Sequence, residues 1–319
     1  MANGRKGLRT ARSEDDAPAS HPRGRPFTDG SLAYAGRHVH EESYPAHTHS
    51  FVEVAVVVAG AGTHHSLAGR HALAAGDVVL LRPGVWHEYE RCADLVLYNC
   101  CFRPGLLRRE LAWAREDALL GHLLWTAPYS LGRRGMLMAR LDDAALQECM
   151  APLRALDRLG SVAGPLHRGD IIGHLTLFLS ALARVVAKEG NSRLSPPASP
   201  HPAVARAMRL LEGDLAHPWT LRELAEELPM VPGSLVRLFK SAVGLPPMAY
   251  LAQQRAEAAA ALLLRDERPI SQVGAAVGWP DPNYFARRFK AHFGLSARAY
   301  RSRFSDDSAF LRTWLHAES

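Results

Sequence analysis

Residues 270–301 carry side chains whose types and spacing suit the recognition of nucleic-acid bases. A short apolar segment is followed by a turn at Gly278 and by a second segment rich in Tyr, Phe, Arg and Lys, which is the pattern of a helix-turn-helix unit. On the second helix, Arg287 can donate two hydrogen bonds to a guanine edge, and Asn283 can read an adenine. The residues predicted to face the groove or the phosphates are Pro282, Asn283, Ala286, Arg287, Arg288 and Lys290.

The apolar residues of this unit must hold the reading helix in place. Phe285, Phe289 and Tyr284 fall on one side of a helix that begins near Asp281, and we expect all three to bury against the preceding helix. The Asp281 carboxylate stands where it can accept hydrogen bonds from the amides of the first turn. The pattern therefore predicts a capped helix with one buried face and one basic, exposed face.

A second, looser copy of the pattern lies about fifty residues upstream, in residues 220–244. Val231 stands at the capping position of its second helix, where a weaker cap costs on the order of 1 kcal/mol. Because Gly233 offers no side chain, we expect the second unit to carry more of the sequence specificity. The predicted buried residues are Leu235, Leu238 and Phe239. The candidates for the groove are Gly233, Ser234, Val236, Arg237 and Lys240.

The segment between the two units reads as one long helix from Pro246 to Arg265, rich in alanine and therefore strongly helix-forming. Twenty residues at 1.5 Å each span roughly 30 Å. That length is close to one turn of B-form DNA, about 34 Å. Such a connector could hold both reading helices against successive major grooves on one face of the DNA.

The two units together resemble the DNA-binding domain of the AraC/XylS family of transcriptional regulators, over about a hundred positions. The resemblance implies double-stranded DNA as a partner. In the second unit it rests on Ile270, Val273, Ala276, Val277, Gly278, Asp281, Tyr284, Phe285, Arg287, Phe289, Lys290, Gly294, Tyr300 and Arg301. In the first it rests on Leu221, Leu224, Ala225, Leu235, Arg237, Phe239, Lys240, Gly244, Tyr250, Arg255 and Ala258.

The positive charge of the chain is concentrated where these units lie. The formal net charge is +6, and residues 201–304 hold 14 Lys and Arg against 9 Asp and Glu. Residues 1–25 hold 6 against 3, whereas residues 26–200 hold 17 of each. A phosphate-facing surface requires such an excess, so the distribution agrees with a DNA partner.

Histidine and glutamate residues recur at a suggestive spacing in the amino-terminal half. His47, His49 and Glu53 come first, and His87 follows Gly76 by eleven residues. This spacing resembles the two motifs of the cupin fold, which implies that these three histidines and the glutamate are metal ligands. Three imidazoles and one carboxylate suit a divalent zinc, nickel, iron or manganese ion. His47 and His49, two apart on a strand, point to the same side.

The match departs from the cupin pattern at Pro83, which comes one residue late, and at Arg91, which replaces an asparagine. The alternative is a set of residues that lines a pocket without holding metal. Other histidines lack comparable spacing, and we expect them at the surface or hydrogen-bonded: His38, His40, His64, His65 and His71. Aromatic residues that could line the pocket of an unknown small-molecule effector, or simply belong to the core, are Phe51, Trp86, Tyr89 and Tyr98.

Composition and periodicity predict an α+β multidomain fold, with a small β-barrel or sandwich, a helical extension and a carboxyl-terminal all-α domain. The resemblance to the cupin motifs implies that the β part is a cupin-like β-barrel. The predicted parts are a disordered tail (1–25), a cupin-like effector-binding domain (26–105), a helical linker or dimerisation region (106–189), a flexible Pro/Ser-rich linker (190–202), an AraC-type double helix-turn-helix domain (203–304) and a carboxyl-terminal tail (305–319).

An apolar stripe in the helical extension has two interpretations. Ile171, Leu175, Phe178, Leu182 and Val185 recur at steps of four, three, four and three. The stripe could form the seam of a homodimer through helices in residues 140–188, or it could pack the helix on its own barrel. We expect no membrane span, because the apolar run in residues 171–186 is too short.

The four cysteines form no CxxC pair, and the amino terminus lacks the apolar stretch of a signal peptide, so we expect a cytoplasmic protein. The sequence predicts a one-component, non-enzymatic regulator, whose barrel senses a small molecule or a metal and changes DNA binding. The alternative is a metal-dependent cupin-type oxygenase or isomerase fused to a DNA-binding domain, because an open coordination position could polarise a substrate.

Overall fold

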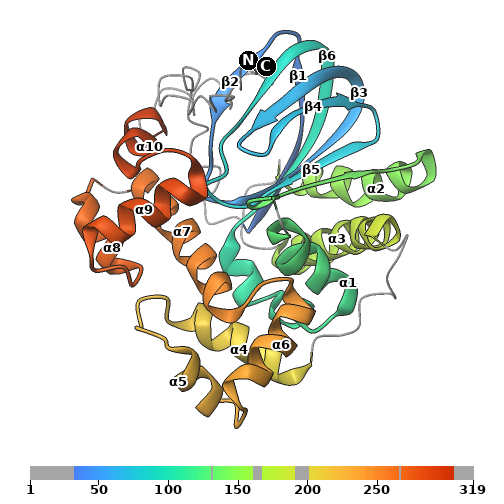
Figure 1. The fold of residues 1–319 in the computed structure, drawn as a ribbon. Helices are drawn as coiled ribbons and strands as arrows, with labels where there is room; N and C mark the ends of the chain where they lie inside the picture. Colours follow the sequence, from blue (N-terminus) through green and yellow to red (C-terminus); the bar gives the residue numbers. More distant parts are fainter. Residues whose placement is uncertain (1–31, 131, 161–166, 191–200, 266, 305–319) are drawn as a thin grey trace, which may run out of the picture.

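The computed structural model describes residues 32–130, 132–160, 167–190, 201–265 and 267–304. It confirms the α+β architecture, with an antiparallel sheet domain followed in the chain by a helical domain (Figure 1). The tails predicted at 1–25 and 305–319, and nearly all of the predicted linker at 190–202, lie outside the described residues.

Within the described residues, seven antiparallel strands form the sheet, in the order β1-β6-β3-β5-β7, with β2 paired to β6 and β4 paired to β3. The two longest strands, β3 and β6, pair with each other. Strands β1 and β2 pair with β6, strands β4 and β5 pair with β3, and β7 pairs with β5. The bounds are β1 Ala33–His40, β2 Tyr44–His47, β3 Val52–Ser66, β4 Gly69–Ala74, β5 Asp77–Leu81, β6 His87–Phe102 and β7 Met136–Arg140.

Strand β3 shows why the two faces of the sheet differ. Val54 and Val56 pack into the core that the sheet shares with the helices, whereas Val57 packs with Leu97 in a separate core inside the curled sheet, which we call the barrel (Figure 1). Successive side chains of a strand point to opposite faces. The buried Glu53 carboxylate is therefore directed to the same side as Val57, into the barrel.

A register shift between β3 and β6 depends on a glycine. Gly60 has a φ of 71°, and a Cβ at this position would lie 1.9 Å from the Asp94 carbonyl oxygen. The shift falls between the half of β3 that pairs with β5 and the half that pairs with β4. Only glycine combines this conformation with so close an approach of two backbones.

The prediction of an all-helical region at 106–189 was wrong in one respect. Strand β7 lies within this region and pairs with β5. Its short apolar sequence does not follow a helical period, and Met136 and Leu137 are buried at the edge of the sheet. Short helical turns precede this strand. They are η2 Pro104–Arg108, η3 Ala112–Arg115, α1 Ala118–Gly121, η4 His122–Thr126 and η5 Ala127–Tyr129.

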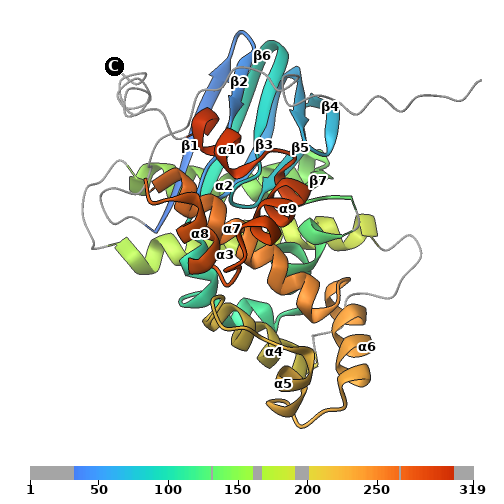
Figure 2. The ribbon, with the colours of Figure 1, turned by 60° about the vertical axis from the view of Figure 1, so that its left-hand side comes forward.

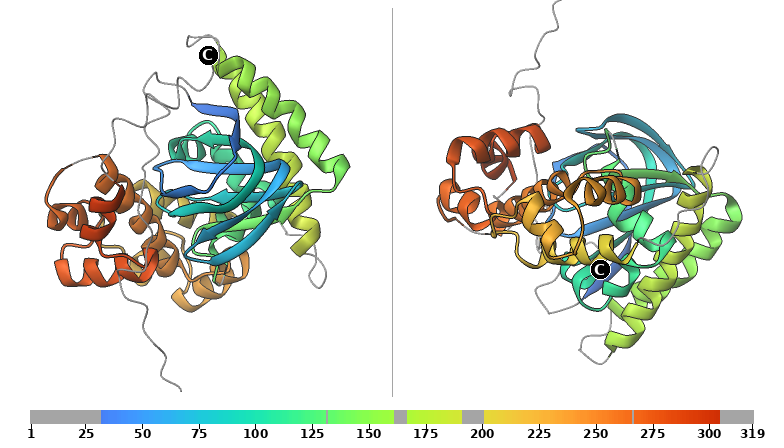
Figure 3. Two further views of the ribbon diagram at one scale, coloured as in Figure 1. Left: turned by 90° about the horizontal axis from the view of Figure 1, so that it is seen from above. Right: turned by 60° about the horizontal axis from the view of Figure 1, so that its bottom comes forward.

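Helices α2 (Asp143–Gly160) and α3 (Arg168–Gly190) lie side by side along the sheet, on the side opposite α8–α10 (Figure 3). Helix α3 is longer than expected and is long and apolar enough to cross a membrane. The prediction that the apolar run in residues 171–186 is too short to span a membrane was therefore wrong. However, Leu175, Phe178 and Leu182 of its stripe are buried in the chain's own core, which accounts for its apolar character. The homodimer stays a prediction.

Seven helices, α4–α10, follow in the part of the chain that the structure describes, and α7 lies at their centre (Figure 2). At 19 residues it spans about 28 Å at 1.5 Å per residue, as the sequence predicts. The first helix-turn-helix unit packs at one end of α7 and the second at the other. The bounds are α4 Pro202–Gly213, α5 Leu221–Glu226, α6 Pro232–Val243, α7 Pro247–Arg265, α8 Ile270–Ala276, α9 Pro282–Phe293 and α10 Ala297–Phe304.

The two units share cores with different parts of the amino-terminal half. Helices α4–α6 contribute to the core that contains the sheet face and α2–α3. Helices α8–α10 have a separate core, which includes Ala46 and Trp86 from the barrel rim, with Leu67 packed against it. The second unit is therefore seated on the rim of the barrel, and we call this contact the rim seat.

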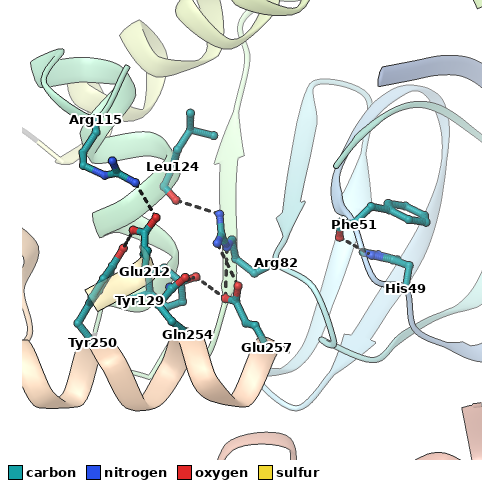
Figure 4. A network of polar contacts seen from close by, with 10 residues as sticks. All are labelled: His49, Phe51, Arg82, Arg115, Leu124, Tyr129, Glu212, Tyr250, Gln254 and Glu257. Carbon is teal, nitrogen blue, oxygen red and sulfur yellow. Dashed lines mark hydrogen bonds and ion pairs between the residues drawn. The ribbon is translucent and has the colours of Figure 1, made fainter. Parts of the chain in front are cut away.

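Two buried ion pairs join the domains beside α7 (Figure 4). Arg82 donates to the Glu257 carboxylate at 3.0 Å, and Tyr129 donates to the same carboxylate. In parallel, Arg115 donates to Glu212 at 2.6 Å. Burial lowers the pKa of the Arg82 guanidinium, but the adjacent Glu257 carboxylate outweighs this effect, and the net pKa is raised.

Replacing one partner tests the role of this network. We expect Glu257→Ala to lower the free energy of unfolding by about 3–5 kcal/mol, because it leaves Arg82 buried without a counter-charge. Urea denaturation measures this change. The control Glu226→Ala removes an exposed carboxylate of α5 and should cost less than about 1 kcal/mol. Equal stability of the two variants would contradict the assigned role.

Candidate functional site

The second helix-turn-helix unit has the local geometry that the sequence predicts. The Asp281 carboxylate accepts from the amides of Asn283 at 2.8 Å and Tyr284 at 3.1 Å, which caps α9. These two hydrogen bonds also lower the pKa of Asp281. The turn before it contains Gly278 at a φ of 83°, where a Cβ would lie 2.5 Å from the Leu215 carbonyl oxygen. Only glycine fits this turn.

One predicted burial in α9 was wrong. Phe285 and Phe289 are buried in the unit's core, whereas Tyr284 is 43% exposed. Adjacent helical residues are about 100° apart, so Tyr284 turns out of the stripe that Phe285, Phe289 and Phe293 form. The predicted reading side chains of this helix are all exposed: Pro282, Asn283, Ala286, Arg287, Arg288 and Lys290.

The first unit has a capped first helix and an uncapped second one. Thr220 and Glu223 form a capping box at the start of α5. Helix α6 begins after Val231, which is exposed and makes no side-chain capping hydrogen bond. Of the predicted reading residues, Gly233, Arg237 and Lys240 are exposed, and Ser234 and Val236 are half-buried. Contact of either helix with DNA stays a prediction.

The four predicted metal ligands meet inside the barrel. One ligand atom from each of His47, Glu53 and His87 lies within 4.8 Å of the others, and all three residues are buried. His49 joins them through a contact of 2.9 Å between its Nε2 and a Glu53 carboxylate oxygen. We call these four residues the barrel cluster.

Backbone carbonyl groups orient two of these rings. His47 Nδ1 lies 2.9 Å from the Pro45 carbonyl oxygen, and His49 Nδ1 lies 2.8 Å from that of Phe51. A ring that donates from Nδ1 presents Nε2 as the ligand atom, which is the usual outer support of a metal-binding histidine. Neither ring nitrogen of His87 has a hydrogen-bond partner among the residues that the structure describes, and burial, chiefly, lowers the pKa of His87 well below 6.5. The donor set therefore fits a divalent metal ion.

His64 was expected at the surface or hydrogen-bonded, and this was wrong. Its ring is fully buried and stacks on His87 with the ring centroids 5.5 Å apart, and within the described parts of the chain neither of its nitrogens has a hydrogen-bond partner. Burial, with a smaller contribution from His71, lowers the pKa of His64 to about 3. The register shift in β3 brings it there, and the spacing of motifs does not reveal such a shift.

A second group of possible ligands lies on the outer side of the same strands. His65 contacts Glu88, and Glu90 lies 3.6 Å from His65. However, Arg70 donates to both oxygens of the Glu90 carboxylate, so this group is an ion-pair network.

The four aromatic residues proposed for an effector pocket do not share one. Tyr98 faces the helices and donates to Asp157 of α2, Trp86 belongs to the rim seat, and Tyr89 lies in the barrel core. Phe51 lines a cleft of about 860 Å³ between the two domains. Tyr89 and Tyr98 separate because residues an odd number of positions apart on β6 point to opposite faces of the sheet, whereas Phe51 and Trp86 lie just before β3 and β6.

The rim seat connects the barrel cluster directly to the second helix-turn-helix unit. Thr48, between His47 and His49, has its hydroxyl 3.1 Å from the Tyr300 hydroxyl of α10. Tyr300 donates to the Gly84 carbonyl oxygen at 2.9 Å, and the Gly84 amide donates to the His49 carbonyl oxygen at 2.9 Å. A Cβ at Gly84 would lie 2.8 Å from the Phe293 ring of α9. Both cluster-bearing segments therefore contact the DNA-binding domain.

Comparisons with known proteins identify the two domains. A family model described as an AraC-like ligand binding domain matches residues 29–160, and a helix-turn-helix domain model matches residues 224–303. The HTH-type transcriptional activator RhaR of Yersinia pseudotuberculosis is 27% identical over 264 residues, covering 83% of this chain and 87% of that protein. RhaR of Klebsiella pneumoniae is 26% identical over 282 residues, covering 87% and 94%.

A solved structure of ToxT from Vibrio cholerae has the same fold, with a TM-score of 0.51 and 13% identity over 87% of this chain and 97% of that one. A ligand-binding domain followed by a helix-turn-helix domain defines a DNA-binding transcriptional regulator. The chain belongs to the AraC family of transcriptional regulators.

The exposed face of α9 yields a test of base reading. We expect Arg287→Ala to weaken binding to a duplex selected from a random pool by the wild-type protein by about 1–3 kcal/mol, with relaxed preference at one base pair. Lys290→Ala should instead weaken binding to all sequences and reduce the salt slope by about 1. Fluorescence anisotropy over a salt series separates the two. Identical behaviour of both variants would contradict the assignment.

Proposed function

We propose that a divalent metal ion, alone or with a small-molecule effector, binds the barrel cluster and controls DNA binding through the rim seat. The observation that carries this proposal is the hydrogen-bond relay from Thr48 through Tyr300 to Gly84, which ties both cluster-bearing segments to α10. A ligand that fixes His47, His49 and His87 also fixes the segments on which the second unit rests.

The rim seat leaves the reading surfaces accessible. It covers Phe293 and Tyr300 on the inner side of the second unit, whereas Arg287 on α9 and Arg237 on α6 are exposed. A bipartite DNA site requires both units at a fixed separation. We therefore infer that the seated arrangement is the one that binds DNA, and that metal binding favours it.

The metal would supply a fixed coordination centre, held by His47, His49, Glu53 and His87. The chain's own residues transmit its presence, because the Thr48 hydroxyl and the Gly84 backbone contact Tyr300. The fused enzyme considered above is not supported, because the relatives are named as transcriptional activators. We propose that the protein acts in the cytoplasm, where its four cysteines stay free.

Metal loading tests the first step. We expect the wild-type protein to take up one equivalent of Zn²⁺, Ni²⁺, Fe²⁺ or Mn²⁺, measured by elemental analysis after desalting, and to bind its selected duplex more tightly when loaded. A gain of about 5- to 150-fold is the usual range of coupling between two sites. His87→Ala should lose the metal and the gain while retaining the affinity of the metal-free protein. DNA affinity that is the same with each metal and with chelator would contradict metal control.

Removing one hydroxyl tests the relay. Tyr300→Phe keeps the ring in the core of the second unit but deletes its hydrogen bonds to Thr48 and Gly84. We expect unchanged metal binding and a metal effect on DNA affinity reduced at least fivefold, which corresponds to about 1 kcal/mol of coupling. The matched control Tyr98→Phe removes a hydroxyl that contacts α2 on the other face of the sheet. If Tyr300→Phe responds to metal like the wild type, the relay is not the route.

A further inference from the structure

A tight basic turn of the amino-terminal domain lies outside every site described so far. Residues 132–135 read Gly-Arg-Arg-Gly and connect η5 to β7, and both arginines are exposed. Gly132, Arg134 and Gly135 have φ values of 84°, 48° and 87°. We call residues 132–135 the arginine turn.

Hydrogen bonds hold the arginine turn in one conformation. The Gly135 amide donates to the Pro128 carbonyl oxygen at 2.9 Å, and the Arg82 amide donates to the Gly135 carbonyl oxygen at 2.8 Å. Arg133 also donates from its guanidinium to the Ala127 carbonyl oxygen at 3.2 Å. The guanidinium groups are therefore carried by a fixed backbone, which lowers the entropy that a bound partner must remove.

The arginine turn lies next to the second reading helix. A Cβ at Gly135 would be 3.0 Å from Val85, and a Cβ at the adjacent Gly84 would be 2.8 Å from Phe293 of α9. Arg134 is also close enough to α9 to affect His292. Burial is the largest cause that lowers the pKa of His292 to about 4, and the positive charges of Arg134 and Arg288 add to it.

The same part of the chain contacts the first unit. The Thr126 hydroxyl, just before η5, donates to the Ala242 carbonyl oxygen of α6 at 3.4 Å. Thr126 therefore lies against α6, and Arg134 lies in the vicinity of α9. Among the described residues, neither Arg133 nor Arg134 takes part in an ion pair with a carboxylate. Positive charge thus gathers beside Arg288 without compensation.

We propose that the arginine turn is a third DNA contact, in which Arg133 and Arg134 of the sensor domain bind backbone phosphates next to the groove that α9 enters. The partner is double-stranded DNA, because the turn continues the basic edge that Arg288 begins on α9 and because an uncompensated arginine pair suits phosphate. The contact is independent of base sequence, since it involves the backbone alone.

This inference rests on the proposed function and adds a consequence to it. The arginine turn belongs to the sensor domain, and the contacts between the domains, which include the rim seat and the Arg82–Glu257 pair, place it beside α9. A change in the seat therefore removes phosphate contacts as well as altering the spacing of the two units. DNA affinity would then depend on the sensor domain directly, through its own charges.

A salt series on the full-length protein tests the inference. The probes are the duplex selected by the wild-type protein and an unrelated duplex of the same length. Each lost phosphate contact lowers the slope of log affinity against log salt by about 0.9, so Arg133→Ala/Arg134→Ala should lower it by about 1.8 on both duplexes. The ratio of wild-type to variant affinity should then fall about twelvefold between 50 and 200 mM salt.

Two further variants separate charge from structure. Arg133→Lys/Arg134→Lys keeps the charge but loses the guanidinium hydrogen bond to Ala127, so it should retain the wild-type slope. The control Arg154→Ala/Arg158→Ala removes two exposed arginines from α2, on the other side of the sheet, and should also leave the slope unchanged. A wild-type slope for the alanine pair in the turn would overturn the inference. A wild-type protein that prefers neither duplex would instead contradict sequence-specific binding itself.

Discussion

The buried ion pair between Arg82 and Glu257 determines where the DNA-binding domain lies on the sensor domain. Both side chains are almost fully buried, and a charge in such a place is tolerated only with its partner and with further hydrogen bonds. Tyr129 supplies one of these hydrogen bonds. Arg115 and Glu212 form a second buried ion pair between the same two domains. Apolar contacts alone would permit sliding, whereas these directional contacts fix α7 in one orientation.

With α7 fixed, the rest of the interface follows. The end of α9 meets Gly84, α10 places Tyr300 against Thr48, and the barrel cluster lies directly behind these contacts. The segment that carries the proposed ligands His47 and His49 is therefore joined to the second helix-turn-helix unit by one hydrogen bond, between the hydroxyls of Thr48 and Tyr300. In such an arrangement, a small shift of His47 or His49 reaches the DNA-binding domain without passing through the linker between the domains.

The sequence predicts local features of this protein well. The Asp281 cap and the length of α7 depend on neighbouring residues and on the period of a helix, whereas the meeting of Glu53 with three histidines was implied by the resemblance to the cupin motifs. Apart from that resemblance, the sequence does not predict contacts between distant segments. Nothing near Thr48 indicates Tyr300 as its partner, and the burial of His64 depends on a register shift that its own spacing does not reveal. Strand β7 was missed for a similar reason, because only its pairing with β5 makes it a strand.

Hydrogen–deuterium exchange of the full-length protein, with and without the bound metal, tests the central claim most directly. That claim is that the barrel cluster and the second helix-turn-helix unit respond as one body. It predicts that metal slows exchange at residues 84–87 and at α10 together, and that Tyr300→Phe confines the slowing to the barrel. Slowing in the barrel of the wild-type protein with no change in α10 would contradict it.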